Sequence, residues 1–181
     1  MNKQEIESYL TQLGQELQDL GVRQTIHVVL IGGAFMLTQV DERRTTDDID
    51  VLFKDIDDIT VSPIYQTFKM AARTVAARNG LKGNWINDVM NDFLRNAGII
   101  PEEKLWRRFG RLEVLLPPKE YVLALKLLAG RPKDRRDIEV LCQQLKIRTR
   151  DQAQRLIDRY IPDKRLQQIN DLDDTLDSFF S

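Results

Sequence analysis

The sequence predicts an α/β (α+β) fold, in which helices flank a small mixed β-sheet and the carboxy-terminal part is helical. Three observations carry this prediction. Short β-branched apolar runs stop at glycine or proline, stretches with helical spacing separate them, and the last third of the chain has helical spacing alone. The chain has 181 residues, of which 42% are hydrophobic and 30% charged. This composition is sufficient for a buried core and excludes general disorder.

The first part of the chain predicts helix, strand, helix and strand in turn. Apolar residues recur at three- and four-residue steps through residues 1–20, which predicts an amphipathic helix ending near Gly21. Residues 26–33 form a β-branched run stopped by two glycines, which is typical of a buried strand. Residues 34–40 continue as a short helix, and residues 48–53 alternate carboxylate and apolar side chains as a second strand.

A helix is expected over residues 63–79, because Ser62 suits the N-cap, Pro63 the first helical position and Gly80 the end.

Strand and helix signals continue to the end of the chain. For residues 85–98, the periodicity does not distinguish a further helix from an irregular covering segment. Residues 111–117 alternate as a third strand, and residues 118–130 predict a helix that opens behind two prolines and closes with a glycine. Three more helices are expected, over residues 133–145, 151–160 and 164–179.

Charge and rare residues narrow the class of protein. The 27 basic and 28 acidic residues give a net charge of −1, so overall charge does not recruit nucleic acid or an anionic membrane. Cys142 and His27 are single residues of their types, which excludes a disulfide framework and a multi-histidine metal site. The sequence has neither a secretory signal nor an apolar run of about 20 residues, so a cytoplasmic protein without a membrane partner is expected.

Two aspartates in the second strand are the first candidates for chemistry. Residues two apart point to the same face of a strand, so Asp48 and Asp50 lie side by side while Ile49 and Val51 face the core. Two close carboxylates repel each other unless a cation or hydrogen-bond donors compensate. Hard oxygen ligands of this kind suit Mg²⁺ or Mn²⁺, which takes one or two carboxylates together with substrate phosphates. The alternative is an exposed edge strand with two solvated aspartates.

A phosphate-binding corner is predicted before this strand. Gly32 and Gly33 stand between a buried strand and a helix, where glycine lets a phosphate approach the backbone and the first N–H groups of the helix. The segment before the second strand supplies groups for phosphate contacts, namely the guanidinium groups of Arg43 and Arg44 and the hydroxyl groups of Thr45 and Thr46. The alternative for the glycines is an ordinary tight turn.

The segment IGGAFMLTQVDERRTTDDIDVLF resembles the signature of the polymerase-β-like nucleotidyltransferase superfamily. With the later LALKLLAGRPKDRRDIEVL, it resembles the nucleotidyltransferase toxins of abortive-infection systems and their uncharacterised bacterial relatives, over about residues 26–145. The resemblance implies that Gly32 and Gly33 hold triphosphate and that Asp48 and Asp50 bind the catalytic metals. The expected organisation is a nucleotidyltransferase-like domain over residues 1–145, with a helical extension over residues 146–181 packed on it.

The later motif implies further site residues. By the resemblance, Lys126 and Arg131 meet phosphate, and Asp134 is a polar support or a catalytic acid or base, with Asp137 also at a matching place. The alternatives are structural. Asp134 and Asp137 suit the first turn of a helix, and Lys126 can snorkel from an apolar helix.

Many superfamily members carry a third carboxylate on a neighbouring strand. The candidate in a recognisable strand is Glu113, expected as a third metal ligand and catalytic residue. The alternative is an outward-facing glutamate paired with Arg111 or Arg108.

The function expected from these residues is metal-dependent transfer of a nucleoside monophosphate from an NTP to an acceptor hydroxyl. The resemblance implies an RNA end or a protein as acceptor, and a toxin neutralised by a separately encoded antitoxin protein. A second hypothesis is a catalytically inactive protein of the same fold that binds RNA or protein. A third is an α/β protein whose two motifs are coincidental, which a separation of more than about 10 Å between them would establish.

Overall fold

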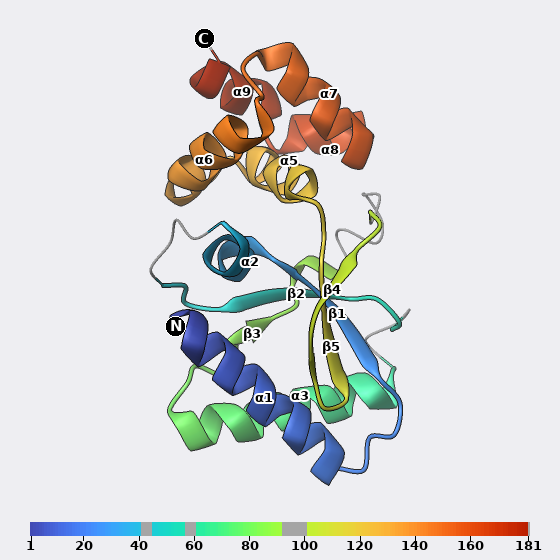
Figure 1. Cartoon of the computed structure of the whole chain (residues 1–181). Coiled ribbons are helices and arrows are strands. Elements are labelled where there is room, and N and C mark those ends of the chain that lie inside the picture. Colours follow the sequence, from blue (N-terminus) through green and yellow to red (C-terminus); the bar gives the residue numbers. More distant parts are fainter. Residues whose placement is uncertain (41–44, 57–60, 92–100, 181) are drawn as a thin grey trace. The chain divides into compact units, whose positions relative to one another are not determined.

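The structure is a computed structural model, shown in Figure 1. It describes residues 1–40, 45–56, 61–91 and 101–180. The predicted class is confirmed, because a five-stranded mixed sheet is flanked by helices and the carboxy-terminal part is helical. Contacts divide the chain into two compact units, one made of Met1–Asn91 with Glu103–Leu116 and the other of Asp92–Glu102 with Pro117–Ser181.

The first unit contains the sheet and three helices. Its elements in chain order are α1 (Lys3–Asp19), β1 (Ile26–Ile31), α2 (Gly32–Gln39), β2 (Ile49–Phe53), α3 (Pro63–Asn79), β3 (Ile86–Asn87), β4 (Lys104–Phe109) and β5 (Leu112–Leu116). The strand order is β3-β2-β1-β5-β4. β1 runs antiparallel to β2 and parallel to β5, while β2 and β3 are parallel and β4 and β5 antiparallel.

Six of these elements were predicted, and β3 and β4 were not. β3 has two residues, which are too few for an alternating pattern. It lies within residues 85–98, where the sequence does not distinguish a helix from an irregular covering segment. β4 reads KLWRRF and is an edge strand with mostly exposed side chains, so apolar periodicity is weak there. The caps of α3 are as predicted: the Ser62 hydroxyl accepts a hydrogen bond from the Tyr65 N–H, and Gly80 is left-handed.

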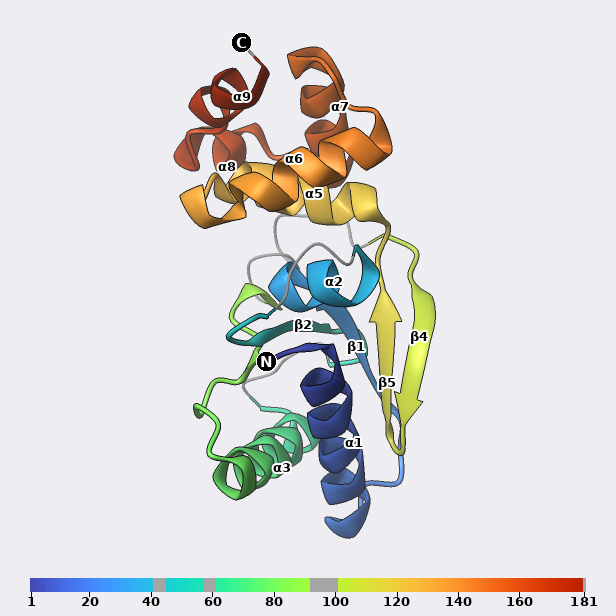
Figure 2. The same cartoon turned by 60° about the vertical axis from the view of Figure 1, so that its left-hand side comes forward.

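Helices α1 and α3 pack against each other on the same side of the sheet (Figures 1 and 2). The predicted apolar stripe of α1 is buried, and consists of Ile6, Leu10, Leu13 and Leu17. Trp85 joins this core just before β3. Its ring meets Tyr9 edge to face, and its indole N–H donates to the carbonyl of Ala72, 2.9 Å away. The indole therefore ties the start of β3 to both helices.

The second unit is helical in the part that the structure describes. It contains α5 (Lys119–Ala129), the 3₁₀ turn η1 (Pro132–Asp134), α6 (Arg135–Leu145), α7 (Arg150–Tyr160), α8 (Lys164–Ile169) and α9 (Leu172–Phe180). Helix α5 contacts α6, α7 and α9, and the second segment of this unit runs from Pro117 to Ser181. The domain boundary expected after residue 145 stays a prediction. The single helix expected over residues 164–179 is interrupted, because Asp171 takes a left-handed φ of 49° between α8 and α9.

In the described parts of the chain, no helix combines the length and the apolar character needed to cross a membrane.

We expect Gly14→Ala to destabilise the first unit, because a Cβ at Gly14 would lie 1.9 Å from the carbonyl oxygen of Phe109. Forced overpacking against backbone costs about 1–3 kcal/mol, which outweighs the gain of at most about 1 kcal/mol in helix propensity. Urea unfolding should show a lower midpoint. The control is Gly83→Ala, where a Cβ meets nothing within 4 Å. Equal midpoints for the two variants would show that α1 does not pack as described.

Candidate active site

The aspartate pair lies at one end of the central antiparallel strands. Asp48 directly precedes β2 and Asp50 is its second residue, and both are half-buried. Their neighbours Ile49 and Val51 are buried, as the alternating pattern predicts. Asp50 is paired with Ile31, the last residue of β1, so the aspartates lie beside the point where β1 becomes α2.

The glycine corner and Asp50 are in direct contact. Gly32 has a left-handed φ of 65°, and a Cβ built on it would lie 2.0 Å from the Asp50 Oδ2 atom. The close approach therefore requires glycine for two reasons, its backbone conformation and the space above its Cα. Helix α2 begins at this residue, and Ile31 at its N-cap makes no side-chain hydrogen bond to the first turn. The separation of more than about 10 Å that would have established two coincidental motifs is therefore absent between Gly32 and Asp50.

Asn87 links the two aspartates and was missed by the sequence analysis. Its Nδ2 atom lies 2.9 Å from Asp50 Oδ1 and 3.4 Å from Asp48 Oδ2. It reaches them because β3 pairs with β2 in a register that sets Asn87 opposite Asp50. The signal in the sequence was an asparagine after a buried Trp-Ile pair, but no strand was recognisable there.

Thr46 braces the loop before the aspartates. Its side chain is buried, its hydroxyl donates to the Asp48 carbonyl 3.1 Å away, and its N–H donates to the Met1 carbonyl. The described bonds of Thr46 thus fix the backbone at Asp48, and a phosphate contact stays a prediction. Arg44 lies outside the described residues. Gly33 lies in the first turn of α2. Its role in triphosphate binding also stays a prediction.

Glu113 is not brought to the aspartates, and this corrects the expectation of a third carboxylate there. It is paired with His27, four residues before Ile31 along β1, which corresponds to about 13 Å of strand. Its carboxylate lies 2.6 Å from an Arg108 nitrogen and 3.3 Å from the His27 Nε2 atom. The alternative, an ion pair with Arg108, is the arrangement in the structure. The sheet order that separates Glu113 from Asp50 depends on long-range pairing, which local periodicity does not report.

Lys126, Asp134 and Asp137 form a buried ion cluster inside the second unit. The Lys126 Nζ atom lies 2.6 Å from Asp134 Oδ1 and 2.7 Å from Asp137 Oδ2, and the three side chains are at most 3% exposed. Half-exposed Arg131 donates from Nε to Asp134 Oδ2 over 2.7 Å. These contacts join α5, η1 and α6. The phosphate roles of Lys126 and Arg131 and the catalytic role of Asp134 stay predictions, because the described contacts are internal.

The charge balance of this cluster keeps Asp134 ionised. Burial acts to raise the pKa of its carboxyl, but the hydrogen bond and charge of Lys126, with a smaller contribution from Arg131, outweigh burial and lower the pKa below its usual value. Asp134 occupies the N-cap position of α6 without making a side-chain capping bond, so its carboxylate serves the two cations.

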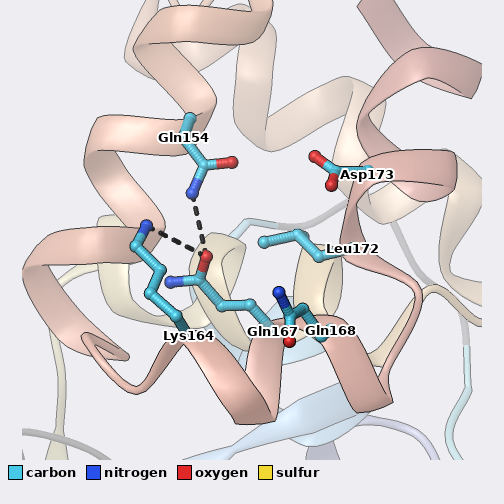
Figure 3. Close-up of a pocket in the computed structure, with 6 residues that line it drawn as sticks. All are labelled: Gln154, Lys164, Gln167, Gln168, Leu172 and Asp173. Atoms are coloured by element: carbon cyan, nitrogen blue, oxygen red, sulfur yellow. Dashed lines mark hydrogen bonds between the residues drawn. The ribbon is translucent and has the colours of Figure 1, made fainter.

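A small polar pocket of about 160 Å³ lies among α7, α8 and α9 of the second unit (Figure 3). Gln167 is its central residue. The Gln167 Oε1 atom accepts hydrogen bonds from Gln154 and Lys164, and its Nε2 atom donates to Asp158 and the Ile161 carbonyl. None of the predicted site residues lines this pocket. Since Gln167 already bonds to protein with both polar atoms, the pocket is a packing junction.

We expect Gly32→Ala and Gly80→Ala to separate backbone strain from contact with Asp50. Both glycines are left-handed, so each alanine variant should lose about 1–2 kcal/mol of stability. A Cβ at Gly80 meets nothing within 4 Å, whereas one at Gly32 displaces the Asp50 carboxylate. Because Asp48 and Asp50 are the predicted metal ligands, Mn²⁺ titration followed by electron paramagnetic resonance should show weakened binding only in Gly32→Ala. Equal Mn²⁺ affinities in the two variants would contradict the role of the glycine corner.

We expect Asp134→Asn to destabilise the second unit by about 3 kcal/mol at pH 7, because it breaks a buried ion cluster. The folded-state pKa of Asp134 is lowered, so its contribution is present above the unfolded value of about 3.9 and is lost as the pH falls through the folded value. Urea unfolding of the wild type should show this loss from about pH 5 downward, and the variant should show a flatter profile. In the control Glu139→Gln, a half-exposed pair with Arg135 is lost and little change is expected. A wild-type profile as flat as that of Asp134→Asn would contradict the assignment.

Comparison with known proteins identifies the chain at the level of a family. A family model described as "Nucleotidyltransferase of unknown function (DUF6036)" matches residues 8–149, which include the glycine corner, the aspartate pair and the buried ion cluster. No curated protein and no solved structure gives a significant match. Because the model matches well over half of the chain, the protein belongs to this nucleotidyltransferase family.

Proposed function

We propose that the protein is a Mg²⁺- or Mn²⁺-dependent enzyme that transfers a nucleoside monophosphate from an NTP to an acceptor hydroxyl. The observation that carries this proposal is the convergence of Asp48, Asp50 and Gly32 at the start of α2. The family match supports nucleotidyltransferase activity in general.

The donor set at this place fits a hard divalent cation. The Nδ2 atom of Asn87 lies within hydrogen-bonding range of Asp48 Oδ2 and of Asp50 Oδ1. These two oxygens are therefore no further apart than the sum of the two nitrogen–oxygen distances. No group of three or more His, Cys, Asp and Glu side chains suited to a metal occurs in the described part of the chain. Two carboxylates with substrate phosphates completing the shell are a normal arrangement for Mg²⁺. When bound, the cation would stabilise negative charge on the reacting phosphates.

The residues of the chain position the reactants in this proposal. Asp48 and Asp50 would hold the cation, and the uncapped first turn of α2 would receive phosphate oxygens through its N–H groups. The acceptor oxygen forms a bond to the α-phosphorus, and the bond from this phosphorus to pyrophosphate breaks. The hydroxyl proton passes to a carboxylate of the pair or to water. Catalysis then depends on orientation and electrostatic stabilisation rather than on a covalent intermediate.

The acceptor that we propose is an RNA end or a protein hydroxyl, in a toxin that an antitoxin protein neutralises. This part rests on the resemblance of residues 26–145 to the toxins of abortive-infection systems. Incubation with each of four labelled NTPs, Mg²⁺ or Mn²⁺ and total cellular RNA, followed by separation of RNA from protein, tests the acceptor. Label in neither fraction would contradict the proposed transfer.

A second candidate function is an inactive member of the family that binds nucleotide, RNA or protein. The observation that favours it is the residue type at position 87. The strand next to β2 presents the amide of Asn87 to Asp50, at a place where a carboxylate would be a third metal ligand. Binding of Mg²⁺-NTP without incorporation of label would select this function.

We expect Asp48→Asn combined with Asp50→Asn to lower nucleotide transfer at least 100-fold and to abolish Mg²⁺-dependent NTP binding. The fold should persist, because asparagine has the same shape and removes the repulsion between the carboxylates. Labelled-NTP incorporation and thermal unfolding measure the two effects. Exposed Asp47→Asn is the matched control, since it removes one negative charge from the same loop. Full activity in the double variant would refute the metal-site assignment.

A further inference from the structure

We infer that Asn87 is a positioning residue that sets the geometry of the metal-binding aspartates. This inference rests on the proposed function and deepens it. The Asn87 Nδ2 group approaches both carboxylates, and a hydrogen bond to the charged form of a carboxylate favours that form. The amide thus reduces the repulsion between the two anions and holds an oxygen of each in a defined direction.

The orientation of the amide is determined by its other end. The Asn87 Oδ1 atom accepts a hydrogen bond from the Val89 N–H over 3.3 Å, so its NH₂ group faces the aspartates. In this orientation the side chain presents donors to the carboxylates. An amide nitrogen with two N–H donors has no lone pair for a metal or for a proton, so Asn87 acts through the aspartates.

The protein holds Asn87 in place with a backbone hydrogen bond before it and side-chain hydrogen bonds after it. Before β3, the Trp85 carbonyl accepts from the Ile49 N–H over 2.7 Å. After β3, Asp88 points to α3, where Tyr65 and Lys69 donate to its carboxylate over 2.7 Å and 3.0 Å.

A third anchor lies four residues beyond Asn87. Buried Asn91 accepts from the Phe53 N–H over 2.7 Å and donates to the Val51 carbonyl over 3.2 Å, continuing the edge of β2 beyond the end of β3. A strand of two residues is thereby held in one register, the register that aims Asn87 at Asp50.

Mn²⁺ binding to the full chain tests this inference, measured by the electron paramagnetic resonance signal of free Mn²⁺ without nucleotide. Loss of a residue that orients metal ligands weakens metal affinity by about 10–100-fold, so Asn87→Ala should bind Mn²⁺ at least about tenfold more weakly than wild type. Asn87→Asp replaces the donor with a third carboxylate. It should bind Mn²⁺ more tightly, and its melting temperature should fall in EDTA and rise on Mn²⁺ addition by more than that of wild type.

Control variants distinguish the role of Asn87 from the existence of the metal site. Asn79→Ala and Asn79→Asp alter an asparagine that also donates two hydrogen bonds, but to Gln12 and the Val75 carbonyl, and should leave Mn²⁺ affinity unchanged. If wild type binds Mn²⁺ through the aspartates while both Asn87 variants match it, the role of Asn87 is overturned and the proposed function stands. If wild type and the Asp48→Asn, Asp50→Asn double variant bind Mn²⁺ equally weakly, the proposed metal site and the inference both fall.

Discussion

The carboxylate of Asp50 lies against the bare Cα of Gly32, and this contact determines how the rest of the candidate site is built. It requires a left-handed residue without a side chain directly after β1, so the chain can turn into α2 beside β2. The antiparallel register of β1 and β2 then places the aspartates next to the first turn of that helix. A carboxylate at a helix N-terminus is electrostatically favourable, and the same N–H groups attract phosphate.

The two aspartates remain an electrostatic problem that hydrogen bonding solves in part. Two unit charges about 4 Å apart interact by about 4 kcal/mol at an effective dielectric constant of about 20. A hydrogen bond to a charged group contributes about 1.5–3 kcal/mol, so the amide of Asn87 by itself does not cancel a repulsion of that size. A divalent cation between the carboxylates would supply a larger compensation. These magnitudes are therefore compatible with the proposed cation binding.

The second unit contains another close pair of carboxylates, and the contrast is informative. Asp134 and Asp137 share the buried ammonium of Lys126, with Arg131 as a further partner of Asp134. This cluster brings its own cations and joins three elements of the unit. Asp48 and Asp50 are instead half-buried, and the amide of Asn87 lies within hydrogen-bonding range of both. The two pairs thus differ in burial, and the half-buried pair is the one for which a cation site is proposed.

Local pattern was sufficient for some parts of this arrangement and insufficient for others, for physical reasons. Strand alternation placed Asp48 and Asp50 on one face, and the glycine pair marked the corner, because both signals arise within a few residues. Glu113 was misplaced because its distance from Asp50 depends on which strands pair, and strand pairing is a long-range property. Asn87 was missed because β3 is held by Trp85, Asp88 and Asn91 through contacts with distant residues rather than by its own periodicity. The residues that bond to Trp85, Asp88 and Asn91 lie on other elements of the chain, so a strand of two residues held in this way has no signal in its own sequence.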